Sequence, residues 1–147
     1  MTALIRSIFV AGVLTVLVGV HSASAQVIGP VEFTTTFPFT VGYASVPAGS
    51  YTIRPDEDNP RILELTGSET GVFFQVENSR APEIASQTEV VFKRYGEGYV
   101  LHDVWIEGSS NHAEAIQVEA EKHHANHGMT GEERVAAQKR GRTSESR

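Results

Sequence analysis

Four histidines lie near the C-terminal end of the sequence, and two of them have a spacing that suits a metal ion: His112, His123, His124 and His127. On a helix, His123 and His127 lie four residues apart on one face, where two neutral imidazoles chelate Zn²⁺, Ni²⁺ or Cu²⁺. Glu119, four residues before His123, would add an oxygen ligand. The spacing therefore predicts a metal site at His123 and His127. The alternative is a solvated tail that takes up metal only adventitiously.

A second polar group lies on the strand predicted for residues 99–107. His102 and Asp103 are adjacent, so the alternation of a strand sends them to opposite faces and they cannot act as a local pair. Asp103 and Glu107 share a face but lie about 13 Å apart at the strand rise, too far for the paired carboxylates of a glycosidase. The sequence has no cysteine and no nucleophile elbow, phosphate loop or dinucleotide fingerprint. We therefore expect no catalytic residues, no cofactor and no enzymatic activity.

The run Asp56-Glu57-Asp58-Asn59 is the most acidic turn of the sequence. Its carboxylates and amide are the hard oxygen ligands that Ca²⁺ prefers, but the twelve-residue spacing of a calcium loop and its terminal glutamate are missing. The composition favours a charged hairpin turn that keeps the ends of two strands soluble.

Three aromatic residues are candidates for contact with a ligand: Tyr95, Tyr99 and Trp105. Exposed aromatic rings on a β-sheet can stack on sugars or contact a partner protein. Tyr95 and Tyr99 flank a predicted hairpin loop, where rings are most often partly exposed. The alternative is that all three rings pack within the domain, as most aromatic residues do.

The N-terminus has the three zones of a cleavable export signal. Arg6 supplies the positive charge, Ile8 to Val20 is an uncharged apolar run, and Ala23-Ser24-Ala25 would be cleaved before Gln26. The apolar run is shorter than the roughly 20 residues that span a bilayer. We expect a signal peptide over residues 1–25, a mature chain in the periplasm or outside the cell, and no transmembrane segment after cleavage.

The charge of the mature chain argues against two classes of partner. The whole sequence has a formal net charge of −6, and cleavage leaves 11 basic and 18 acidic residues, a net charge of −7. Binding to nucleic acid requires clustered Lys and Arg, and adhesion to anionic lipid requires the same. We therefore expect no nucleic-acid partner, and an unknown protein or carbohydrate partner at the cell envelope.

The pattern of residues 26–111 is that of a single all-β domain. Residues 31–41 alternate strictly between apolar and polar, and Pro38 makes this strand an edge or divides it in two. About seven short strands separated by turns predict a small antiparallel β-sandwich or barrel, between which periodicity does not choose. Residues 112–147 have few apolar side chains, and we predict a polar, partly helical or disordered tail that is dispensable for folding.

An ordered series of short motifs runs through the predicted domain: Phe37-Pro38-Phe39-x-Val41-Gly42, Val46-Pro47-Ala48-Gly49-x-Tyr51-Thr52-Ile53 and Phe92-Lys93-Arg94-Tyr95-Gly96. With Tyr99, Leu101, Val104-Trp105 and Gly108-Ser109, the series resembles a group of small secreted bacterial β-domains of unknown function. The resemblance covers residues 37 to about 110 and implies a fold and an exported location. It implies no catalytic residue and does not reach the histidines of the tail.

Three functions are compatible with these features. The one that we favour is an exported, non-catalytic β-module that binds or scaffolds a partner at the cell envelope. The alternatives are a periplasmic metal-handling protein that uses the histidine tail, and a small-barrel enzyme whose interior holds a cavity.

Overall fold

The computed structural model describes residues 28–118 and 128–140, and every regular element in these ranges is a β-strand. The predicted signal peptide and the predicted metal ligands His123 and His127 lie outside the described residues. The strands are β1 (Val31–Thr35), β2 (Phe39–Val41), β3 (Ala44–Val46), β4 (Gly49–Pro55), β5 (Ile62–Thr66), β6 (Gly71–Arg80), β7 (Glu89–Tyr95), β8 (Gly98–Trp105), β9 (Asn111–Ala115) and β10 (Met129–Lys139).

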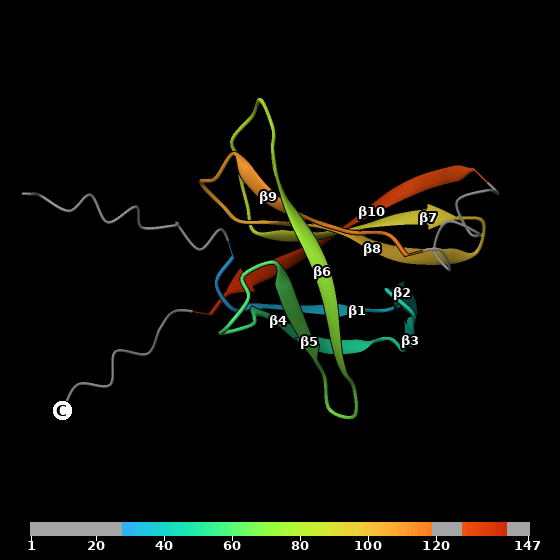
Figure 1. Ribbon diagram of the computed structural model, residues 1–147. Helices are drawn as coiled ribbons and strands as arrows, with labels where there is room; N and C mark the ends of the chain where they lie inside the picture. Colours follow the sequence, from blue (N-terminus) through green and yellow to red (C-terminus); the bar gives the residue numbers. More distant parts are fainter. Residues whose placement is uncertain (1–27, 119–127, 141–147) are drawn as a thin grey trace, which may run out of the picture.

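Eight of these strands form a closed antiparallel barrel (Figure 1). The order around the barrel is β8, β7, β10, β1, β4, β5, β6 and β9, and β9 pairs back with β8. β2 and β3 form a small hairpin outside this circle, and Thr40 of β2 pairs in parallel with Val100 of β8. The predicted small antiparallel all-β domain is confirmed. The pairing of β8 with β9 makes it a barrel, because it closes the sheet on itself.

The predicted alternation of residues 31–41 is confirmed, and the strand is interrupted around Pro38. Val31, Phe33 and Thr35 of β1 are buried, and the two residues between them are exposed. The strand ends at Thr35 and β2 begins only at Phe39, because Pro38 has no N–H to donate to a sheet. The strand is therefore divided in two, and its second half leaves the barrel to pair with β3.

The interior of the barrel is filled by apolar side chains from all eight strands. Phe92 is fully buried and lies 5.0 to 6.1 Å, between ring centroids, from Phe33, Phe37 and Phe39. Aliphatic residues close the remaining volume, among them Ile53, Leu63, Leu65, Leu101 and Val104, each at most 1 % exposed. This packing supplies the core that a chain without disulfides requires.

The prediction of a partly helical or disordered tail from His112 onward is wrong for its described residues, which form most of β9 and all of β10. β9 contributes Ala113 and Ala115 to the core, and β10 pairs with β7 on one side and with β1 on the other. β10 has no fully buried residue. Its backbone hydrogen bonds to β1 and β7 therefore hold it in the barrel. The buried apolar residues of β9 are small alanines and β10 is rich in charged residues. Neither strand therefore shows the alternation of large apolar side chains by which a strand is predicted from sequence.

The Tyr51→Phe protein is expected to be less stable than the wild type near neutral pH. It is also expected to lose less of its stability than the wild type does when the pH is raised. The Tyr51 hydroxyl donates a hydrogen bond of 2.6 Å to the Pro47 carbonyl, a contribution of about 1 kcal/mol. Burial raises the pKa of Tyr51 above its ordinary value of 10.0. The unfolded chain therefore ionises first, so this contribution to stability is present below pH about 10 and is lost as the pH rises further.

Urea unfolding of wild type and of Tyr51→Phe, at neutral pH and at about pH 11, measures both effects. Tyr43→Phe is the matched control because the side chain of Tyr43 is 79 % exposed. An identical pH dependence in the wild type and in Tyr51→Phe would show that Tyr51 ionises alike in the folded and unfolded chains.

Candidate functional site

Three carboxylates lie in one row across the outer surface of the barrel. Glu114 of β9 is paired in register with Glu77 of β6 on one side and with Asp103 of β8 on the other. All three side chains point outward, because the intervening Ala113, Ala115 and Val104 face the core. We call Glu77, Glu114 and Asp103 the carboxylate row. Like charges directly opposite one another destabilise a sheet, so a positive charge near the row would stabilise this arrangement.

A β-bulge brings His102 onto the same surface as Asp103. In the pairing of β7 with β8, Val91 lies opposite Asp103 and Phe92 opposite Leu101, so His102 is the extra residue. A bulge interrupts strict alternation, and His102 Nδ1 lies 3.0 Å from Asp103 Oδ2, without hydrogen-bond geometry. The prediction that alternation keeps these two side chains on opposite faces is wrong.

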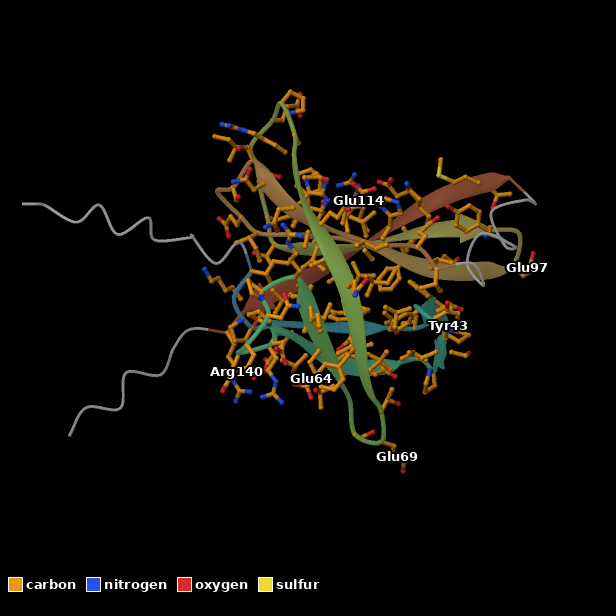
Figure 2. The ribbon with its side chains drawn as sticks, viewed as in Figure 1. Tyr43, Glu64, Glu69, Glu97, Glu114 and Arg140 are labelled. Atoms are coloured by element: carbon orange, nitrogen blue, oxygen red, sulfur yellow. The ribbon has the colours of Figure 1, made fainter. Side chains whose placement is uncertain are left out.

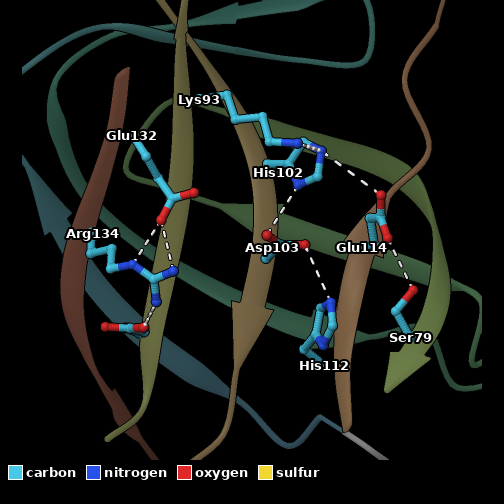
Figure 3. Close-up of polar contacts among 9 residues, drawn as sticks. Ser79, Lys93, His102, Asp103, His112, Glu114, Glu132 and Arg134 are labelled. Atoms are coloured by element: carbon cyan, nitrogen blue, oxygen red, sulfur yellow. Dashed lines mark hydrogen bonds and ion pairs between the residues drawn. The ribbon is translucent and has the colours of Figure 1, made fainter. Parts of the chain in front are cut away.

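His112 completes the group from the neighbouring strand (Figure 3). Its ring stacks on the indole of Trp105, with centroids 3.9 Å apart and planes 12° from parallel, which fixes its position on β9. His112 Nε2 lies 3.7 Å from Asp103 Oδ1. The residue is only 9 % exposed, so the imidazole lies largely out of water beside two carboxylates.

Contacts on either side hold the members of the group in place. Lys93 Nζ lies 2.6 Å from His102 Nε2, so the lysine donates and the ring presents its lone pair. The Ser79 hydroxyl donates to Glu114 Oε2 at 3.0 Å. The Oε1 of the same carboxylate lies 3.8 Å from His102 Nε2, and among the described residues it makes no hydrogen bond.

The outer surface continues over β7 and β10 with a second charged network. Arg134 of β10 hydrogen-bonds Glu132 of its own strand (Figure 3). It also hydrogen-bonds Glu89 of β7. Burial lowers the pKa of Arg134, but the hydrogen bonds to Glu89 and Glu132 outweigh burial and raise it. One guanidinium faces two carboxylates in this network, and its hydrogen bond to Glu89 joins β10 to β7.

The carboxylate row borders a small hollow on the surface. The hollow has a volume of about 260 Å³ and is lined by Glu77, His102, Glu114, Ala115, Ile116 and Gln117. Within the described part of the chain, Asp103, His112 and Glu114 are the residues whose ligand atoms group as a metal ion requires, all within 4.8 Å of one another. Oxygen and imidazole nitrogen together suit borderline divalent ions such as Zn²⁺.

Two of the predicted ligand-binding residues are engaged in packing. Tyr99 stacks on Phe37, with ring centroids 4.1 Å apart, and Trp105 stacks on His112. Tyr95 is half-buried at the end of β7. Tyr99 and Trp105 are six residues apart on one strand, a separation of about 20 Å. The structure therefore does not bring these rings together into one binding surface.

The acidic turn between β4 and β5 has the structure of an ordinary turn. Asp56 Oδ1 accepts hydrogen bonds from the backbone N–H groups of Asp58 and Asn59, at 3.1 and 2.9 Å. Such side-chain to backbone bonds stabilise a tight turn. The predicted charged hairpin turn is confirmed.

A second hollow, of about 400 Å³, is mainly apolar. We call it the apolar hollow, and it is lined by Gly42, Tyr43, Ile62, Phe73, Phe74, Gln75, Ile116 and Val118. Tyr43 and Phe73 are 79 % and 63 % exposed, and together they form an apolar patch of the kind that marks interaction sites. Tyr43 directly precedes β3, and no described strand pairs with the outer edge of β3.

Comparison with protein families, with curated proteins and with solved structures finds no match to this chain. Among the described residues there is no helix long and apolar enough to cross a membrane.

Proposed function

We propose that the protein is an exported, non-catalytic β-barrel module that binds an extended peptide segment of a partner protein at the cell envelope. The observation that carries the proposal is the apolar hollow beside the outer edge of β3, with which no described strand pairs. Export is the part of the proposal that rests on residues 1–25, where the sequence has the three zones of a signal peptide.

The two features of this surface suit the two parts of an extended peptide. The outer edge of β3 offers backbone N–H and C=O groups that no described strand uses, and an added strand would pair with them. Tyr43 lies beside the β2–β3 hairpin (Figure 2). The apolar hollow that Tyr43 lines with Phe73 would take an apolar side chain of the peptide. Backbone pairing supplies affinity in such complexes and the side-chain pocket supplies selectivity.

A binding role also agrees with the filled interior of the barrel. Residues that point inward, such as Phe92, Leu65 and Val90, are completely buried against one another. The hollows described above lie on the outer surface, where a partner protein reaches them directly. The net charge of −7 for the mature chain favours a protein partner over nucleic acid.

Peptides selected from a random library on the wild-type protein are expected to bind Phe73→Asp at least about tenfold more weakly, a loss of about 1.4 kcal/mol. A charge placed in the apolar hollow would have to lose its hydration when the peptide binds. Tyr43→Ser is expected to weaken the same peptides. Fluorescence anisotropy of labelled peptides measures both changes.

Ile84→Ser is the matched control, because Ile84 is 69 % exposed and does not line the hollow. Its affinity for the selected peptides is expected to equal that of the wild type. The proposal is wrong if Phe73→Asp binds as tightly as the wild type, or if the selection yields no peptide that binds.

A further inference from the structure

We propose that Asp103, His112 and Glu114 form a binding site for one transition-metal dication, such as Zn²⁺, on the outer wall of the barrel. This site is separate from the apolar hollow, and it does not involve the histidine pair of the tail.

The distances within the group are already close to those of a coordinated ion. Two ligand atoms held about 2.1 Å from one zinc ion stand roughly 3.0 to 4.2 Å apart, depending on the angle between them. His112 Nε2 and Asp103 Oδ1 are 3.7 Å apart, within that interval. The complete set of three ligand atoms lies within 4.8 Å, so a small rotation of the Glu114 side chain is sufficient to bring it onto the same ion.

Buried atoms of the group lack the hydrogen bonds that such atoms normally make. Within the described chain, Asp103 Oδ1 and His112 Nδ1 are buried without a hydrogen-bond partner. A buried, unsatisfied polar atom costs about 1–3 kcal/mol. An ion in front of Asp103 Oδ1 would satisfy that oxygen directly, and it would compensate the repulsion between Asp103 and Glu114, which face each other in register.

At metal sites, residues that contact the ligands fix the orientation of those ligands. Side chains next to the proposed ligands are placed to do the same here. His102 faces the Oδ2 of Asp103 and so leaves Oδ1 directed toward His112. The Ser79 hydroxyl binds Oε2 of Glu114, which leaves Oε1 for the ion. Lys93 binds the ring of His102 on its far nitrogen, so its charge is directed at His102 and away from His112.

The three protein ligands leave one or more coordination positions of the ion open. Structural zinc sites have four protein ligands, whereas three ligands plus water are typical where the ion also meets a small molecule. Glu114 is a member of the proposed site and also lines the hollow of about 260 Å³. Water is therefore expected to complete the coordination on the side of this hollow.

The site has a built-in reporter, because Trp105 is the only tryptophan of the chain and stacks on His112. Titration of the full mature chain with Cu²⁺ or Ni²⁺ is expected to quench its fluorescence saturably, with a midpoint that shifts when Zn²⁺ competes. Calorimetry with Zn²⁺ is expected to give one site that persists in His123→Ala/His127→Ala.

In that tail-substituted background, Glu114→Gln and His112→Ala are each expected to lower the Zn²⁺ affinity at least roughly a hundredfold. Glu114→Gln keeps the size of the side chain at a position that is 44 % exposed, so it tests the site without disturbing the fold. Circular dichroism verifies that each variant is folded.

Glu57→Gln, in the acidic turn, is the control and is expected to bind Zn²⁺ as its parent does. The proposal is overturned if the tail-substituted protein binds no Zn²⁺, or if Glu114→Gln and His112→Ala, both folded, bind Zn²⁺ with unchanged affinity.

Discussion

A chain that ends at Val118 is expected to lose the folded barrel. This truncation removes β10, which lies between β7 and β1 and pairs with both. Without it the barrel is open along two strand edges, and the interior that Val135 and Ala137 help to cover is exposed to water. A domain of this size has a total stability of about 5–15 kcal/mol, and we expect the truncation to remove most or all of it.

Thermal unfolding followed by circular dichroism tests this expectation directly. The control is a chain that ends at Arg140, which keeps every described strand and also the ion pair of 3.1 Å between Arg140 and Glu32. If the chain ending at Val118 melts within a few degrees of this control, β10 is not required for the fold, and the closure of the barrel has been misassigned.

Phe92→Ala is expected to destabilise the protein by about 3–5 kcal/mol, the usual range for a large-to-small change at a buried aromatic residue. Phe92 is completely buried and lies at the centre of the aromatic cluster. It contacts Phe37 edge-on at 5.3 Å and Phe39 at 5.0 Å between centroids. The cavity left by its ring cannot close, because the surrounding strands are held in the barrel by their pairing.

Chemical denaturation measures the change, and Phe73→Ala is the matched control. Phe73 is the same residue type on β6 but is 63 % exposed, so its loss is expected to change stability by less than about 0.5 kcal/mol. Equal effects at the two positions would mean that the aromatic cluster does not form the centre of the core.

The hollows beside the two proposed binding sites share one residue. Ile116 lines both the apolar hollow and the hollow beside the carboxylate row, and its backbone N–H donates to Gln75 O of β6 at 2.9 Å. Of the proposed metal ligands, Glu114 lines the second of these hollows, so the two sites are close neighbours on the surface. Peptide affinities measured with and without Zn²⁺ would show whether the two sites are coupled.

Local patterns in the sequence were sufficient to predict most of the strands. The alternation of residues 31–35, the break at Pro38 and the glycine turn between β7 and β8 are decided by neighbours in the chain. Gly96 takes a positive φ of 60° there, as expected of glycine in a tight hairpin loop. These features follow from the residues themselves because sterics and side-chain period act over a few positions only.

The candidate metal site could not be predicted in the same way. The sequence pattern places His112 in a polar tail because the residues around it, Ala113 to Ala115, contain no large apolar side chain. Strict alternation places His102 and Asp103 on opposite faces, because a bulge opposite Val91 and Phe92 leaves no mark in the sequence of β8 alone. Both errors concern pairing with a strand elsewhere in the chain.

The sequence by itself determined that this protein is an all-β domain with a particular set of core side chains, because apolar period and turn chemistry are local properties. The tertiary structure decided that the sheet closes, that β10 lies between β7 and β1, and that Asp103, His112 and Glu114 face one point in space. Register between strands distant in the chain sets these three features. It is fixed only when all the pairings and the core are satisfied together.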